Sequence, residues 1–238
     1  MSVKTQKIIV FVILIICVCF SVASFAVQFL PEGLSAAEIY EKCLKNVVEV
    51  KAVTEDVAES YGTGEILHED GTLITNAHVV TFKRADAVTE FENYYVRFSY
   101  EEGYRRAELE NYDSDCDLAV LKITDLSGAV LSPLETSSSD GLNYGDKIYA
   151  VGNASNFGIG IFSGTVSIPS VTVELDGLKR RVIQCDVTIA AGNSGGALLD
   201  KNGNLVGITT FRTKDNMNNV VYGIVYAIPI KIVLEFID

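Results

Sequence analysis

A serine set among glycines is the first feature of this sequence that suggests covalent chemistry. The segment reads Gly192-Asn-Ser-Gly-Gly196. Glycines around a serine let the backbone turn sharply, which exposes the hydroxyl and aims neighbouring N–H groups at one point. Such a point can hold the oxyanion of an acyl-transfer intermediate. Because the same letters are ordinary loop composition, the segment needs partners elsewhere before it indicates catalysis.

The positions of the two histidines decide which catalytic framework fits Ser194. A G-x-S-x-G segment also carries the nucleophile of α/β-hydrolases, in which the histidine follows the serine along the chain. Here His68 and His78 both precede it, so that framework is excluded. His68 lies in the polar turn His-Glu-Asp-Gly and is expected to be solvated. His78 lies in Leu-Ile-Thr-Asn-Ala-His-Val-Val, at the end of a predicted apolar strand, and we predict that it is the general base.

An acidic cluster supplies the third group, a carboxylate that orients the imidazole and stabilises its charged form. Asp113, Asp115 and Asp117 lie close together in the sequence. Asp117 comes directly before the apolar strand Leu-Ala-Val-Leu, so it alone is expected to be partly buried. The other two are interpreted as solvated turn acids. The sequence therefore predicts Asp117 as the partner of the histidine.

Short β-branched runs separated by turn signals must position these residues, and this pattern is typical of an all-β barrel or sandwich. The first set of strands is predicted near residues 46–53, 61–68, 72–76, 94–99, 104–111 and 118–123. The second set is predicted near residues 146–152, 160–168, 171–186, 195–200, 203–211 and 221–228. Residues 125–145 are expected to link the two halves. Residues 68–71 and 200–203 are predicted hairpin turns, each ending in glycine.

The two ends of the chain differ from this pattern. Lys4 and Lys7 precede an uncharged apolar run over residues 8–30, which indicates an export signal or a membrane anchor. Cleavage after Ala26 and retention as an anchor both remain open, and the length of the run favours the anchor. The two lysines place the rest of the chain outside the cytoplasm. Residues 31–45 are predicted to be helical with Ser35 as N-cap, and residues 230–238 to form a closing helix.

Composition excludes several other classes of function. The net charge is −12, with 19 basic against 31 acidic residues, which argues against binding to nucleic acid. Cys17 and Cys19 lie in the apolar run. Cys43, Cys116 and Cys185 show no CxxC spacing, so we expect lone buried thiols, with no disulfide framework, metal site or cofactor.

Five motifs occur in the order found in one known family. They are Gly62-Thr-Gly64, Thr75-Asn-Ala-His-Val-Val80, Asp117-Leu-Ala-Val-Leu-Lys-Ile123, Gly192-Asn-Ser-Gly-Gly196 and Gly223-Ile-Val-Tyr-Ala-Ile-Pro229. Over about residues 46–230, the chain resembles the protease domain of the HtrA (Deg-type) serine endopeptidases, within the trypsin-like superfamily. The resemblance implies a double β-barrel with its active site between the barrels. The protease domain would span residues 46–238, with the barrels near 46–124 and 140–229.

The resemblance also implies site roles. His78 would be the general base, Asp117 its orienting acid and Ser194 the nucleophile, with the N–H groups of Gly192 and Ser194 as the oxyanion hole. The family's usual Asn-Pro before this glycine is Ala190-Ala191 here, and no PDZ domain is expected in this chain. Asn193 stands where digestive relatives carry an aspartate, so activation through that ion pair is not expected. Members often form trimers through the segment before the first barrel, here residues 26–46, which implies a homotrimer.

Substrate preference is predicted from the residues expected to line the S1 pocket. In this fold they come before the nucleophile, here Thr188, Ile189 and Ala190, and from the following strand, here Thr209 and Phe211. None is acidic, so we expect small aliphatic side chains at the cleavage site. Ile189 and Phe211 as plain core residues remain the alternative.

The sequence thus predicts a serine endopeptidase that cleaves unfolded or exposed protein segments outside the cytoplasm, either secreted or held by its N-terminal segment. A catalytically silent, peptide-binding trypsin-like domain is the alternative. An esterase would share the acyl-transfer machinery, but the order of histidine and serine excludes its usual fold.

Overall fold

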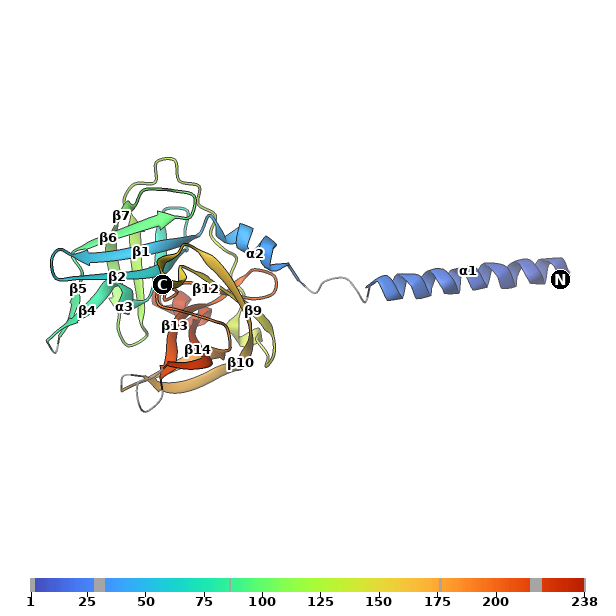
Figure 1. Cartoon of the computed structure of the whole chain (residues 1–238). Helices are drawn as coiled ribbons and strands as arrows, with labels where there is room; N and C mark the ends of the chain where they lie inside the picture. Colours follow the sequence, from blue (N-terminus) through green and yellow to red (C-terminus); the bar gives the residue numbers. More distant parts are fainter. Residues whose placement is uncertain (1–2, 28–32, 86, 176, 215–219, 238) are drawn as a thin grey trace. The chain divides into compact units, whose positions relative to one another are not determined.

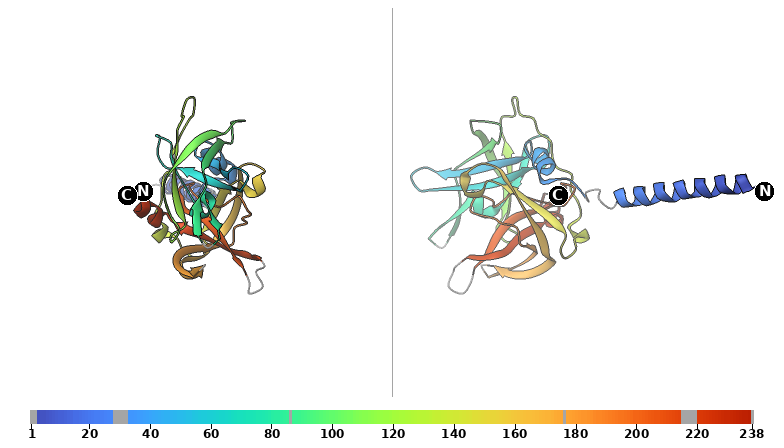
Figure 2. Two further views of the ribbon diagram at one scale, coloured as in Figure 1. Left: turned by 90° about the vertical axis from the view of Figure 1, so that its left-hand side faces the viewer. Right: turned by 45° about the vertical axis from the view of Figure 1, so that its right-hand side comes forward.

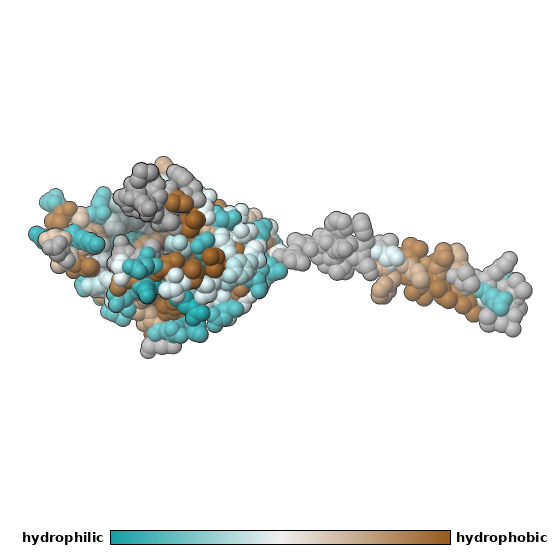
Figure 3. All heavy atoms as spheres, turned by 90° about the horizontal axis from the view of Figure 1, so that it is seen from below, coloured by the Kyte–Doolittle hydropathy of each residue, from teal (hydrophilic) through white to brown (hydrophobic). Residues whose placement is uncertain are grey.

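The computed structural model describes every residue except 1–2, 28–32, 86, 176, 215–219 and 238. The chain divides into two compact units, Met1–Gly33 and Leu34–Asp238. The first contains helix α1 (Val3–Val27), whose apolar side chains form the brown band in Figure 3. Its Lys4–Ser21 window is long and apolar enough to cross a membrane. This helix satisfies the sequence criterion for either a signal sequence or an anchor.

In the second unit, six antiparallel strands close the first barrel (Figure 1). Around the barrel they are β1 (Val47–Thr54), β2 (Ala58–Ile66), β3 (Thr72–Thr75), β8 (Leu118–Ile123), β7 (Arg105–Asp113) and β6 (Asn93–Phe98). Short loops join β1 to β2, β2 to β3, β6 to β7 and β7 to β8, whereas residues 76–92 lie between β3 and β6. Gly71, in the predicted turn between β2 and β3, has a φ of +86°. Glycine is suited to this left-handed conformation because it has no Cβ.

Six more antiparallel strands close the second barrel. In order they are β10 (Gly160–Leu175), β11 (Leu178–Cys185), β14 (Val220–Pro229), β13 (Leu205–Lys214), β12 (Ala197–Leu199) and β9 (Lys147–Gly152). Both barrels are visible in the two views of Figure 2. The prediction of an all-β double barrel is confirmed.

Apolar side chains from both barrels share one core with two helices. Ile74 of β3 and Leu118 of β8 pack in the same cluster as Tyr149 of β9. Helix α2 (Ala36–Cys43) adds Ile39, and helix α4 (Ile230–Ile237) adds Val233. This shared core fixes the barrels against each other, and therefore fixes the residues that project into the junction between them.

Helix α2 covers only part of the predicted helical segment 31–45, and it begins at the predicted N-cap. There Ser35 and Glu38 form a capping box, in which each satisfies the other's backbone N–H. Two short 3-10 turns, η1 (Ser139–Gly141) and η2 (Ala154–Asn156), lie before and after β9. The three cysteines of this unit are free; Cys43 and Cys185 are buried as predicted, but Cys116 is half-buried.

Two details of the strand prediction are wrong. The segment 171–186, expected to be one strand, is instead the end of β10, a turn with Gly177 at a φ of +79°, and β11. A hairpin of β4 (Thr81–Arg84) and β5 (Ala87–Glu90) was not expected. Its strands are largely exposed and lack the apolar alternation that marks a half-buried strand.

Candidate active site

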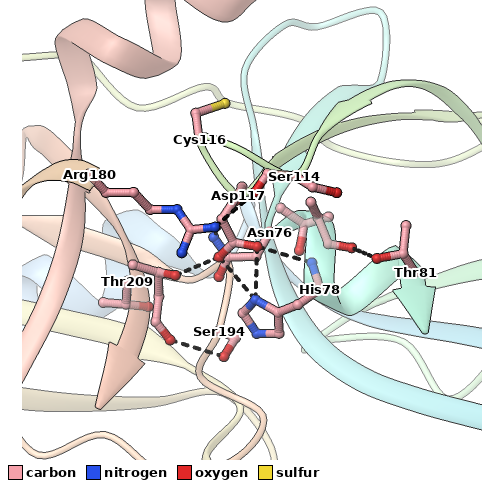
Figure 4. A network of polar contacts seen from close by, with 12 residues as sticks. Asn76, His78, Thr81, Ser114, Cys116, Asp117, Arg180, Ser194 and Thr209 are labelled. Atoms are coloured by element: carbon pink, nitrogen blue, oxygen red, sulfur yellow. Dashed lines mark hydrogen bonds and ion pairs between the residues drawn. The ribbon is translucent and has the colours of Figure 1, made fainter. Parts of the chain in front are cut away.

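His78 and Asp117 form a direct contact at the junction of the barrels (Figure 4). His78 lies on the short helix α3 (Ala77–Val80), which follows β3, while Asp117 comes just before β8. The Nδ1 atom of His78 is 2.9 Å and 3.0 Å from the two carboxylate oxygens of Asp117. The backbone N–H of His78 also donates to Asp117 Oδ1 at 3.1 Å. The carboxylate therefore fixes both the backbone and the ring of the histidine.

Asp117 is held in an unusual conformation by its surroundings. It is 3% exposed and has a φ of +59°, a left-handed conformation that costs energy for a residue with a side chain. Its Oδ2 accepts a hydrogen bond of 2.6 Å from the Thr210 hydroxyl. Its carbonyl accepts one of 2.9 Å from the Asn76 side chain. These contacts offset the strain and aim the carboxylate at His78.

The loop that carries Ser194 depends on its glycines. Gly192 has a φ of +96°, and a Cβ there would lie 2.2 Å from the Asn153 carbonyl oxygen. Gly195 has a φ of +85°, and a Cβ there would lie 2.1 Å from the Thr63 carbonyl oxygen. Both positions therefore require glycine for conformation and for space. The two glycines let the Ser194 turn pack directly against β2 and the turn after β9.

The Ser194 hydroxyl donates to the Thr210 carbonyl oxygen at 3.3 Å. Thr210 is the residue whose own hydroxyl holds Asp117, so one threonine connects the serine with the acid. Within the described part of the chain, no hydrogen bond joins Ser194 to His78. The three predicted triad residues thus lie in one network, shown in Figure 4, in which the serine is directed to a carbonyl and not to the imidazole.

Hydrogen bonds fix the two peptide groups that carry the N–H groups predicted to form the oxyanion hole. In a trans peptide the C=O and the following N–H point in opposite directions. The Ala191 carbonyl accepts from Ser155 N–H at 2.6 Å, which directs the Gly192 N–H away from η2. The Asn193 carbonyl accepts from the Thr209 hydroxyl at 2.7 Å, which sets the direction of the Ser194 N–H.

The residues predicted to line the S1 pocket differ in their exposure to solvent. Thr188 is exposed, and Ile189 packs in the core of the second barrel. Ala190 is half-buried, and its carbonyl accepts from Asn193 N–H at 3.1 Å. Thr209 is 1% exposed and uses its hydroxyl to fix the serine loop.

Phe211 is half-buried, and its ring is stacked 5.5 Å from that of His78. It contributes to a cavity of about 280 Å³ that is also lined by His78, Asp117, Phe82 and Arg180. Phe211 therefore reaches the site, whereas Ile189 contributes to the barrel core.

The other histidine and the other nearby acidic residues, which were not predicted as triad members, lie outside the His78–Asp117 contact. His68 is exposed, in the turn where it was expected. Asp113 is half-buried and accepts a hydrogen bond from the N–H of the exposed Asp115. Asp186 binds the backbone and hydroxyl of Thr165, so its carboxylate ties β10 to the chain after β11.

Three residues of the site were not identified from the sequence. Thr210 and Arg180 contact segments 93 and 65 residues away and belong to no recognised motif. The sequence marks Thr63 only as the middle residue of the motif Gly62-Thr-Gly64. It is fully buried, and its hydroxyl donates to the Gly192 carbonyl at 2.6 Å.

Comparison with known families agrees with this architecture. Residues 62–208 match the family model described as "Trypsin-like peptidase domain", and the chain belongs to that family. Within it, similarity to the HtrA-type proteases confirms the resemblance drawn from the motifs.

The chain is 35% identical over 173 residues to the serine endoprotease DegS of Haemophilus influenzae, covering 72% of this chain and 47% of that protein. It is 29% identical over 212 residues to the serine protease HTRA4 of Mus musculus, covering 85% and 40% respectively. The solved structure of the HtrA-type protease AlgW with a tripeptide superposes with a TM-score of 0.72 at 30% identity, covering 86% of this chain and 62% of that one. The chain thus spans about half the length of DegS.

Proposed function

We propose that this chain is a serine endopeptidase in which Ser194 is the nucleophile, His78 the general base and Asp117 the orienting acid. The observation that carries the proposal is the direct contact of His78 Nδ1 with the buried Asp117 carboxylate, inside a trypsin-like peptidase domain. The three side chains come from both barrels, so only the folded double barrel brings them together.

The geometry of His78 defines its part in the reaction. With Nδ1–H donated to Asp117, the neutral imidazole keeps a lone pair on Nε2. On substrate binding, the Ser194 hydroxyl turns from the Thr210 carbonyl to Nε2. His78 takes the hydroxyl proton while the serine oxygen attacks the scissile carbonyl carbon. Asp117 stabilises the imidazolium that results.

The remaining steps use the same groups. The tetrahedral oxyanion accepts hydrogen bonds from the N–H groups of Gly192 and Ser194. His78 then donates its proton to the leaving amine, the C–N bond breaks, and an acyl-enzyme remains on Ser194. Water, deprotonated by His78, attacks the ester and releases the second product. No cofactor or metal is required by this chemistry.

The substrates we propose are peptide segments of unfolded or exposed protein, with small aliphatic residues before the cleaved bond. Structures of the HtrA-type protease AlgW were solved with a tripeptide and with a decapeptide, which supports peptides as the substrate class. In this proposal, residues 1–30 are a signal peptide or anchor and residues 46–238 are the protease domain. Residues 26–46 form the contact between the subunits of a homotrimer.

We place the catalytic unit outside the cytoplasm, held by α1 or secreted. The apolar Lys4–Ser21 window and the two N-terminal lysines support this location. In intact spheroplasts, externally added protease should degrade the catalytic unit of the full chain. Complete protection until the membrane is lysed would rule this location out.

One observation favours the alternative, a silent peptide-binding domain: the Ser194 hydroxyl is bonded to Thr210 and not to His78. Casein digestion by the full-length chain, beside Ser194→Ala, separates the two functions. The endopeptidase requires fragments from the wild type and essentially none from the variant, because loss of a triad member costs several orders of magnitude in rate. Intact casein in both samples would support the silent domain.

A further inference from the structure

Arg180 is a buried cation at the junction of the barrels. A contribution to stability alone does not explain why it lies there. It lies on β11 and is 9% exposed. Its Nη1 has no hydrogen-bond partner, although the atom is shielded from solvent. A buried guanidinium with an unpaired N–H group lowers stability, and such a group in a folded protein calls for an explanation.

The guanidinium contacts the segment that leads into Asp117. Its Nε donates to the Asp115 carbonyl at 2.7 Å, and its Nη2 donates to the Ser114 carbonyl at 2.8 Å (Figure 4). Both acceptors are main-chain carbonyls, and no carboxylate among the described residues forms an ion pair with Arg180. A planar guanidinium can hold two carbonyls in a fixed relative position, which a flexible ammonium cannot do.

The same side chain contacts the histidine half of the site. The Arg180 Cζ atom lies 5.0 Å from the centre of the Phe211 ring, within cation–π range. That ring is in turn stacked 5.5 Å from the ring of His78. Arg180 is therefore linked to Asp117 through the backbone and to His78 through Phe211.

We infer that Arg180 is a positioning residue for the Asp117–His78 pair. By fixing the Ser114 and Asp115 carbonyls from the opposite barrel, it holds Asp117 at its left-handed φ of +59° and keeps the carboxylate aimed at His78 Nδ1. This role rests on the proposed function, because it matters to catalysis only if His78 and Asp117 perform it. A displacement of about 1 Å in such a pair can lower a rate by about 100-fold.

A double-mutant cycle tests this role in the full-length chain, with the rate of covalent labelling by a fluorophosphonate as the measurement. Arg180→Leu should lower the labelling rate by about 10- to 100-fold, and Arg180→Lys should lower it by less. In a protein that already carries Asp117→Asn, adding Arg180→Leu should lower the labelling rate by less than about 2-fold. The carboxylate that Arg180 positions is already absent there. Arg181→Leu is the matched control, since Arg181 is exposed on the same strand and bonds Ser170.

Equal losses from Arg180→Leu in both backgrounds would mean that Arg180 acts only on overall structure. Wild-type labelling by a folded Arg180→Leu would overturn the inference directly. If Arg180→Leu does not fold, Arg180→Lys is carried through the same cycle and judged by the same criterion. Failure of the proposed function is distinct, since labelling of the wild type would then equal that of Ser194→Ala.

Discussion

The buried hydroxyl of Thr63 holds the carbonyl of Gly192 at 2.6 Å, which joins β2 of the first barrel to the serine loop of the second. The same hydroxyl accepts from Asn153 N–H at 2.9 Å, and Thr63 N–H donates to the Ser194 carbonyl at 2.8 Å. One residue thus fixes the backbone on both sides of Asn193. The N–H groups proposed to form the oxyanion hole consequently depend on contacts between the barrels.

Thr63→Val should lower both the stability and the reactivity of Ser194. Valine keeps the volume but leaves the Gly192 carbonyl and Asn153 N–H buried without a partner, at about 1–3 kcal/mol for each group. Thr63→Ser keeps the hydroxyl and should retain most of the reactivity. Thermal unfolding and fluorophosphonate labelling measure the two effects. A Val variant that matches the wild type in both would show that the contact is dispensable.

The two histidines should differ sharply in their contribution to activity. His78→Ala removes the partner of Asp117 and should reduce casein cleavage by several orders of magnitude. His68→Ala alters an exposed turn and should leave cleavage nearly unchanged. Initial rates for both variants, with circular dichroism as a check on folding, measure the difference. Similar losses from the two substitutions would contradict these assignments.

Glu65 should make stability depend on pH. It is fully buried in β2, neither carboxylate oxygen has a hydrogen-bond partner, and burial raises its pKa well above the ordinary value of 4.5. Because the pKa of Glu65 is higher in the folded than in the unfolded state, protonated Glu65 contributes to the free energy of unfolding. This contribution is fully present below about pH 4.5 and is lost as the pH rises towards the folded-state pKa.

Glu65→Gln, which does not titrate, should therefore gain stability relative to the wild type as the pH rises from 4.5. The limiting slope is about 1.4 kcal/mol per pH unit. Urea unfolding of both proteins between pH 4 and pH 8 measures this difference, and Glu69→Gln in the exposed turn is the control. A difference between wild type and Glu65→Gln that does not change with pH would refute the prediction.

Cleavage should follow small aliphatic residues rather than Lys or Arg. A cationic side chain entering S1 loses its hydration, and a buried carboxylate would be needed to compensate. None of the residues predicted to line the pocket is acidic; they are Thr188, Ile189, Ala190, Thr209 and Phe211. Mass spectrometry of a digested peptide library identifies the cleavage sites. If most cuts follow basic residues, the predicted pocket is wrong.

Local signals made much of the fold predictable. Gly203, the last residue of a predicted turn, has a φ of +75°, a conformation that favours glycine. The capping box at Ser35 marks the start of α2. The β4–β5 hairpin gave no such signal, because Ala85 has a φ of +55° without being glycine or asparagine. The strand predicted over residues 160–168 stops before Pro169, whereas β10 continues through it. Pro169 lies where the pairing with β11 is irregular, so its missing N–H is tolerated.

The site was predictable only where chemistry is tied to a motif. His78, Asp117 and Ser194 lie in segments whose residue types suggest their roles. Thr210 and Arg180 acquire theirs from partners that the fold brings from the other barrel, and no local pattern marks a threonine or an arginine for such a contact. The orientation of the Ser194 hydroxyl is likewise a property of the tertiary structure.

Mapping of the fluorophosphonate adduct on the full-length chain tests the central assignment most directly. Reaction of the wild type, followed by proteolysis and mass spectrometry, should give a single adduct on Ser194. The adduct should be absent in Ser194→Ala and should form several orders of magnitude more slowly in His78→Ala. An unmodified Ser194, or an adduct that forms equally fast without His78, would contradict the proposed catalytic triad.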